Sequence, residues 1–179
     1  MSRLAAIALF GILAACATAP TKPAAAPNPT QVVAVGATYQ IPPFLAVHDI
    51  DDKPGATNFD FDDNVTRCSG HAIFETVGNA KDHDDYVKDK LLSVVEDTWK
   101  KDGATFTPSQ STVPMLGASA RVTSYVVKKG DDTTGSAIVD HHFADQVLSI
   151  VFAFDCPEPG VISKELENLA RVVDSQKKQ

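Results

Sequence analysis

The chain has 179 residues, of which 44% are hydrophobic and 22% are charged. These values indicate one globular domain, because domains usually contain about 100–200 residues, and they exclude collagen, a coiled coil and a wholly disordered chain. Lysine and arginine number 16 against 23 aspartates and glutamates, which gives a net charge of −7. We expect no binding of nucleic acid, because contacts to phosphate need clustered cations and the sequence contains no basic patch.

Residues 1–15 have the pattern of a secretion signal. A short cationic start, residues 1–3, precedes ten apolar residues, 4–13, far fewer than the roughly 20 that a membrane-spanning helix needs. The motif Leu13-Ala14-Ala15-Cys16 follows and resembles the lipobox of bacterial lipoproteins. The resemblance implies that diacylglycerol is attached to the Cys16 sulfur, that the chain is cleaved before it and that the new amine is acylated. An ordinary signal peptide with an incidental cysteine is the alternative.

A lipidated Cys16 would anchor the protein to a bacterial membrane without a spanning helix, since each buried methylene contributes about 0.8 kcal/mol. Residue 17 is alanine and not aspartate, which by the sorting rule of enteric lipoproteins implies the outer membrane, on its periplasmic side; the inner membrane is the alternative. Residues 17–30 hold four of the eleven prolines and no large apolar side chain, which is typical of a tether. We therefore expect a lipidated tether over 16–30 and a globular domain over 31–179.

An amphipathic helix of about twenty residues is predicted over 82–103. Its cluster Asp82-His83-Asp84-Asp85 is interpreted as a helix start, and lysines followed by a glycine close the helix, as the helix dipole favours. A metal role for that cluster is the alternative. Apolar residues recur every four positions along the helix, at Val87, Leu91, Val95 and Trp99.

Strands are predicted on both sides of this helix. Two precede it, over 31–41 and 69–77, and four follow it, over 104–113, 118–128, 135–143 and 147–154, with connections short enough for antiparallel pairing. Both faces of the last strand are apolar or small, so we expect it to be central and covered on both sides. A closing helix opens at Pro159-Gly160, with an apolar stripe of Ile162, Leu166, Leu169 and Val173.

This order of elements resembles the Mog1/PsbP-like fold, and the small periplasmic DcrB-like lipoproteins in particular. The resemblance covers about residues 36–175 and is carried by Tyr39-Gln40-Ile41-Pro42, the helix from Tyr86 to Trp99, Leu116-Gly117-Ala118 with Ala120-Arg121, and the segments 147–154 and 169–175. It implies an α+β protein, an α/β/α sandwich with a largely antiparallel sheet, one long central helix and one C-terminal helix. It also implies a protein that binds partners, and no common catalytic reaction is known for the family.

Two cysteines, Cys68 and Cys156, remain once Cys16 is set aside. Cys68 precedes the predicted strand 69–77 and Cys156 follows the strand 147–154, so antiparallel neighbours would bring the two thiols together. A secreted location permits their oxidation, and we expect a structural disulfide. A redox-active dithiol is the alternative, but that chemistry usually needs a close Cys-x-x-Cys pair.

The segment 48–64 holds six carboxylates against one lysine, together with Ile50 and two phenylalanines. This mixture suits a partner with basic and apolar features. We therefore predict a loop that contacts another envelope protein through Phe59, Asp60, Phe61, Asp62 and Asp63. Three alternatives remain open: a solvated acidic hairpin loop, a calcium-binding loop that does not follow the EF-hand spacing, and burial of both phenylalanines in the core.

A weaker candidate is a metal site around Asp140-His141-His142. In a strand, alternation sends Asp140 and His142 to one face and His141 to the other. A zinc or copper site needs three or four protein ligands, and His71 or His48 could supply the third. Asp140, His142 and His71 are thus the candidate ligands, and ordinary strand residues are the alternative.

Catalytic motifs are not found in the sequence: it contains no Gly-x-Ser-x-Gly, no His-Glu-x-x-His and no glycine-rich phosphate loop. We expect neither an enzyme nor a cofactor. The sequence predicts a membrane-anchored periplasmic lipoprotein that acts as a non-catalytic binding or assembly factor for an envelope component. A module that binds calcium or a transition metal is the alternative.

Overall fold

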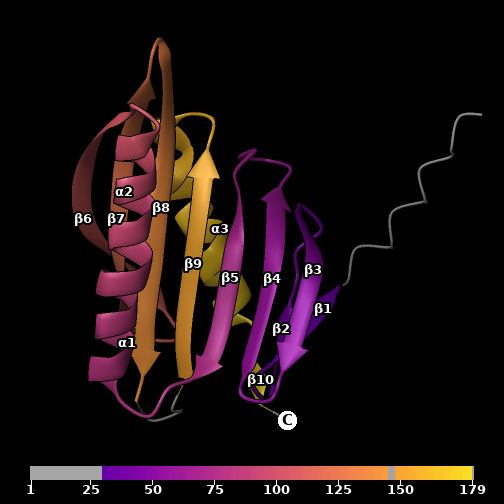
Figure 1. The fold of residues 1–179 in the computed structure, drawn as a ribbon. Coiled ribbons are helices and arrows are strands. Elements are labelled where there is room, and N and C mark those ends of the chain that lie inside the picture. The colour runs from indigo at the N-terminus through magenta and orange to yellow at the C-terminus, as the bar shows by residue number, and fades with distance from the viewer. Residues whose placement is uncertain (1–29, 145–147, 179) are drawn as a thin grey trace, which may run out of the picture.

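The computed structural model describes residues 30–144 and 148–178. The predicted signal peptide, Cys16 and the tether up to residue 29 lie outside the described residues. The described chain is an α+β protein with largely antiparallel sheets, as predicted. Figure 1 shows a broad sheet with a helical segment in front of it and a C-terminal helix behind it.

The main sheet has seven strands in the order β3-β4-β5-β9-β8-β7-β6, and each neighbouring pair is antiparallel. Strand β9 lies in the middle, and its alternating residues pack toward both faces, which confirms the prediction of a central, covered strand. The seven strands are β3 (Leu45–Lys53), β4 (Ala56–Asp63), β5 (Ser69–Thr76), β6 (Thr105–Met115), β7 (Ala118–Lys129), β8 (Asp132–Phe143) and β9 (Leu148–Cys156).

The segment 48–64 was predicted to be a loop, and this prediction is wrong. Its residues lie in β3 and β4, joined by a turn at Pro54 and Gly55. Every second side chain of β4 is buried, so Phe59 and Phe61 alternate with acidic residues that face the other way. A strand with three aspartates among its eight residues looks like a solvated loop by composition, although its period of two is that of a half-buried strand.

The helical segment runs without interruption through α1 (Ala80–Tyr86), the π-helix η1 (Val87–Leu92) and α2 (Ser93–Lys101). Its N-cap is Asn79, whose side chain accepts the Asp82 amide, so the helix begins before the predicted Asp82. A repeat of four residues drifts by about 40° per step around an α-helix of 3.6 residues per turn. The wider turns of η1 reduce that drift and keep the predicted apolar stripe on the sheet.

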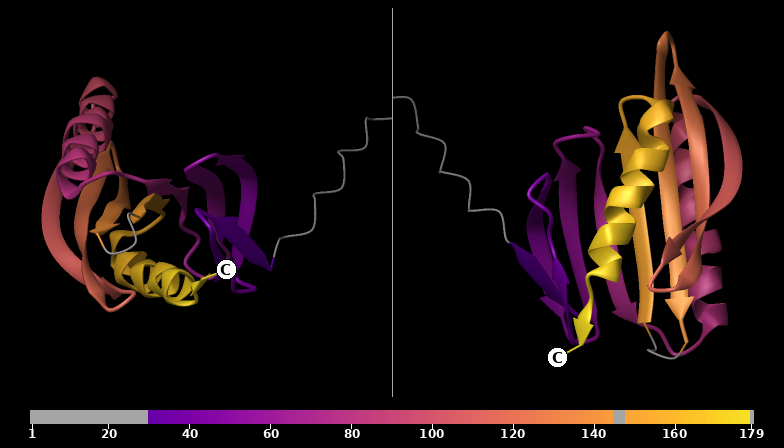
Figure 2. Two further views of the ribbon diagram at one scale, coloured as in Figure 1. Left: turned by 90° about the horizontal axis from the view of Figure 1, so that it is seen from below. Right: turned by 180° about the vertical axis from the view of Figure 1, so that it is seen from behind.

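Helix α3 (Ile162–Asp174) follows the 3₁₀ turn η2 (Pro159–Val161) and packs on the opposite face of the sheet from the helical segment (Figure 2). Its predicted apolar stripe is buried in the main core, where it meets residues of β9 such as Phe152 and Phe154. Among the described residues, no helix has the length and apolar character that crossing a membrane requires.

The predicted strand 31–41 is instead a hairpin of β1 (Gln31–Ala34) and β2 (Ala37–Gln40), to which β10 (Lys177–Lys178) adds a third strand. Val35 and Gly36 form the turn, both with positive φ, of 49° and 73°. A β-branched residue rarely adopts that conformation, so the sequence gives little sign of the turn. This small sheet covers the α3 face of β4 and β5, with the rings of Tyr39 and Phe74 4.8 Å apart.

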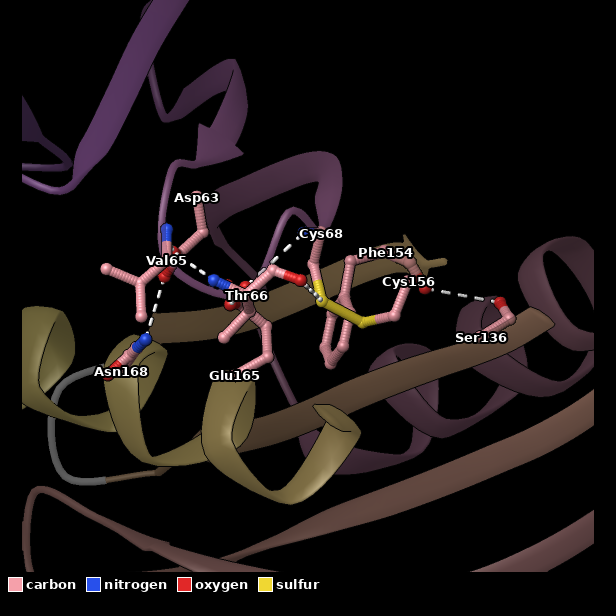
Figure 3. Close-up of a disulfide and its surroundings, with 9 residues drawn as sticks. All are labelled: Asp63, Val65, Thr66, Cys68, Ser136, Phe154, Cys156, Glu165 and Asn168. Atoms are coloured by element: carbon pink, nitrogen blue, oxygen red, sulfur yellow. Dashed lines mark hydrogen bonds between the residues drawn. A yellow bond between two sulfur atoms is a disulfide. The ribbon is translucent and has the colours of Figure 1, made fainter. Parts of the chain in front are cut away.

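Cys68 and Cys156 form a disulfide, as predicted, with a Cα–Cα distance of 4.2 Å (Figure 3). The pairing register explains it. Ser69 at the start of β5 lies opposite Asp155 at the end of β9, so the residue before one and the residue after the other are adjacent. The bond joins the two strands at the centre of the sheet and closes a sequence separation of 88 residues.

Candidate functional site: a groove beside helix α2

The helical segment covers only one half of its face of the sheet. Val87 packs on Ile138 of β8 and Val151 of β9, and farther along Trp99 packs on Tyr125 of β7, with ring centroids 5.0 Å apart. These contacts hold the segment over β6 to β9. The same face of β3 and β4 carries no helix among the described residues, as Figures 1 and 2 show.

A groove of about 510 Å³ lies where the covered half of this face meets the open half. Its helix wall is formed by Val94, Val95 and Trp99 of α2, and its floor by Ile138 and Ala153 of the sheet. This volume falls within the range of about 300–1,000 Å³ that is usual for small-molecule sites. Apolar surface therefore remains open to solvent on the helix side.

The opposite wall of the groove is polar and acidic. His48, Asp60 and His71 lie directly opposite one another in β3, β4 and β5 and therefore share one face. His71 Nδ1 is 2.6 Å from a carboxylate oxygen of Asp60, and His48 Nε2 is 3.1 Å from Asp62. The pKa of His48 is raised, mainly by a hydrogen bond of 3.1 Å with Asp49, and Asp62 contributes to the rise.

The residues predicted to contact a partner are divided between the two faces of β4. Phe59 and Phe61 are each 1% exposed, with rings 5.7 Å from Phe74 and 6.2 Å from Phe152. Their side chains belong to the core, the alternative that the sequence left open, so they do not present an apolar contact surface. Both phenylalanines are buried because successive side chains of a strand point to opposite faces of the sheet.

Asp60 and Asp62 face the groove, whereas Asp63 is buried on the α3 side. The Asp63 carboxylate accepts the backbone N–H groups of Val65 and Thr66 and the side-chain amide of Asn168 (Figure 3). These hydrogen bonds hold the turn after β4 against α3. Of the predicted partner set, Asp60 and Asp62 therefore present their side chains to the candidate site, and Phe61 is part of its lining although its ring is buried.

The predicted metal ligands Asp140, His142 and His71 do not come together. His142 Nδ1 lies 3.0 Å from the Ser149 hydroxyl, and His71 pairs with Asp60. Among the described residues, these three do not form a group of side chains able to share one ion. The sequence could place two of them on one face of β8, but it could not give the lateral distance between β5 and β8.

Asp140 belongs to a partly buried polar cluster beneath α1 that the sequence did not reveal: Asp140 and His83 are buried, whereas Arg121 and Asp84 are exposed. Its carboxylate accepts hydrogen bonds from Arg121 of β7, at 2.6 and 3.1 Å, and contacts His83 of α1 at 3.1 Å. Burial alone would raise the pKa of Asp140, but the hydrogen bonds with His83 and Arg121 outweigh it and lower the pKa. Arg121 also binds Asp84 at 3.0 Å, so the cluster fixes the start of the helical segment on the sheet.

The apolar wall of the groove was also missed. Val94 lies outside the four-residue stripe, and it is 56% exposed. Val94 was the signal in the sequence, because a large apolar residue outside the apolar stripe of a helix indicates an exposed apolar surface.

Comparisons with known proteins do not assign the chain to a family. No family model matches the chain, and no curated protein matches it. Among solved structures, the chain is similar to a protein of Bacteroides thetaiotaomicron VPI-5482 whose crystal structure was determined at 1.50 Å resolution, with 14% identity and a TM-score of 0.43. The match covers 80% of this chain and 45% of that one, so the chain spans less than half the length of that protein.

Proposed function

We propose that this protein is a non-catalytic binding factor that a lipid anchor at Cys16 holds at the periplasmic side of a bacterial outer membrane. Its ligand is another envelope protein, and the binding site is the groove between α2 and β3 to β5. The anchor is supported by the lipobox-like motif and the proline-rich tether that follows it. The groove, with one open apolar wall and one acidic wall, is the observation that carries the proposal.

The chemistry of the groove specifies what its ligand offers. Val94 and Trp99 suit an apolar side chain, and Asp60 and Asp62 opposite them suit a lysine or arginine. The net charge of −7 favours approach of the same kind of partner. We infer that the ligand is a segment of an envelope protein with neighbouring basic and apolar residues.

We also propose that the protein belongs to the Mog1/PsbP-like family. Helices packed on opposite faces of one antiparallel sheet support an α/β/α sandwich of the Mog1/PsbP-like kind. The order of elements, with the helical segment between β5 and β6 and α3 at the end, supports it as well. Under this proposal the small sheet of β1, β2 and β10 is an addition to that core.

A pair of matched variants tests the binding proposal. Val94→Asp places a charge on the apolar wall of the groove, and Val65→Asp places the same charge at a residue that is also exposed, by 64%, but does not line the groove. The full chain is produced in its bacterial host with each substitution, and the envelope proteins that co-purify are quantified. Val94→Asp is expected to remove a specific partner that Val65→Asp retains. Equal recovery by both variants would contradict the proposal.

The acidic wall is tested through salt dependence. Replacing both Asp60 and Asp62 with asparagine removes two charges and keeps the side-chain shapes. Recovery of the partner should then fall at low salt and become less sensitive to added salt, because exposed charges act mainly on association. Circular-dichroism melts of all variants establish that the fold is retained.

A further inference from the structure

We propose that His48, Asp49 and Asp60 form a site for a divalent transition-metal ion, with zinc as its representative, at the polar edge of the groove. One ligand atom from each of the three side chains lies within 4.8 Å of the other two. Within residues 30–144 and 148–178, no other three His, Cys, Asp or Glu residues form such a group. The site does not depend on the proposed binding of an envelope protein.

The backbone brings these three side chains to one place by two different means. His48 and Asp60 lie directly opposite each other in β3 and β4, so alternation puts them on the same face. Asp49 follows His48 and would point to the other face of a regular strand. The ladder is irregular between His48 and Asp51, however, and Asp49 has a φ of +51°.

This irregularity directs Asp49 back toward its neighbour. A β-bulge changes the direction in which a side chain points, and bulges are frequent beside functional sites. The carboxylate of Asp49 lies 3.1 Å from Nδ1 of His48 as a result. A left-handed conformation is rare for residues other than glycine, and aspartate is among those that adopt it most readily.

Outer partners hold two of the three ligands. Nε2 of His48 lies 3.1 Å from Asp62, so with its proton on Nε2 the imidazole donates to Asp62 and presents the Nδ1 lone pair toward Asp49. Protein zinc sites commonly contain this arrangement of carboxylate, histidine and metal. The second ligand, Asp60, is held by Nδ1 of His71 at 2.6 Å.

The donor set selects the class of ion. One imidazole nitrogen and two carboxylate oxygens match a zinc site with three protein ligands and a free position for water. Calcium takes six to eight oxygen ligands, and imidazole favours zinc, copper and nickel. The side chains of His48 and Asp49 are 45% and 80% exposed, so an ion can reach them from solvent, and His48 and Asp60 border the groove.

Isothermal titration calorimetry of the purified full chain with zinc chloride tests the site. We expect one ion per chain to be bound through these residues, and His48→Ala to weaken that binding by at least about tenfold, since even outer partners of a metal site contribute 10–100-fold. The matched control is His142→Ala, which removes a part-buried strand histidine outside the cluster and should leave the affinity unchanged.

Asp49→Asn provides a second variant that keeps the fold, because asparagine also accepts the left-handed backbone and the position is exposed. It should weaken zinc binding as well. The proposal is overturned if no zinc binds, or if zinc binding survives His48→Ala and Asp49→Asn, as it would if Cys16 or another group held the ion. Tighter binding of calcium than of zinc in a parallel titration would also overturn it.

Discussion

The substitution Glu165→Gln should make the protein more stable above neutral pH. Glu165 lies on α3 and is 0% exposed. One carboxylate oxygen accepts the Thr66 hydroxyl at 2.5 Å, and the other has no hydrogen-bond partner among the described residues (Figure 3). Burial raises the pKa of Glu165 from 4.5 to about 7, the Thr66 hydroxyl offsets part of this rise, and the neighbouring Asp63 adds to it.

The direction of the effect follows from the number of protons bound by each state. Between pH 4.5 and about 7, Glu165 is protonated in the folded protein and ionised in the unfolded chain, so the folded state loses stability as pH rises through this window. Each unit of difference in pKa corresponds to about 1.4 kcal/mol. A rise from 4.5 to about 7 therefore corresponds to about 3 kcal/mol at pH 8. Glutamine keeps the shape and the acceptor for Thr66 without the charge.

Urea unfolding at pH 5 and pH 8, without reductant, measures the effect. The free energy of unfolding of Glu165→Gln should exceed that of the parent at pH 8 by 1–3 kcal/mol, on the order of the linkage value, and by much less at pH 5. The control is Glu167→Gln on the same helix, whose side chain is 61% exposed and pairs with Lys164 at the surface. If the parent and Glu165→Gln respond to pH in parallel, the assignment of this titration to Glu165 is wrong.

Three further predictions concern the disulfide, the core and the anchor. Reducing Cys68–Cys156 should lower the free energy of unfolding by about 4–5 kcal/mol, because the bond closes a separation of 88 residues; two reactive thiols in the unfolded, unreduced protein would contradict the bond. Replacing Phe59 with alanine should cost about 3–5 kcal/mol, since its ring is buried, and an unchanged melting temperature would show that it is not core. Cys16→Ser should release the protein from the membrane fraction or leave it unprocessed, whereas an intact mass showing an unmodified Cys16 thiol in the native protein would refute lipidation.

The sequence predicted best those elements whose pattern is set by burial on one face. Residues 69–77, the four strands after the helix and the stripe of α3 alternate or repeat with the period of their structure, and all are found near their predicted places. The disulfide could be predicted for the same reason, because two strand ends that pair bring their flanking cysteines together.

In the elements that the sequence did not predict, the local residues favour a different structure from the one observed. Val35 has positive φ although it is β-branched, which hid the turn between β1 and β2. The aspartates of β3 and β4 suggested a loop. The His83–Asp140 contact spans 57 residues, and no local pattern in either segment predicts a partner at that distance.

The position of the groove follows from what each half of one sheet face can bury. Over β8 and β9 this face presents Ile138, Val151 and Ala153, which a helix can cover with a gain of free energy from apolar contact. Over β3 and β4 it presents His48, Asp60 and Asp62, and covering them with an apolar helix would remove charges from water without pairing them. The helical segment therefore lies over β6 to β9 and leaves uncovered the strands that carry the acidic residues. The alternation that buries Phe59 and Phe61 on one face is thus also the reason that Asp60 and Asp62 line the groove on the other face.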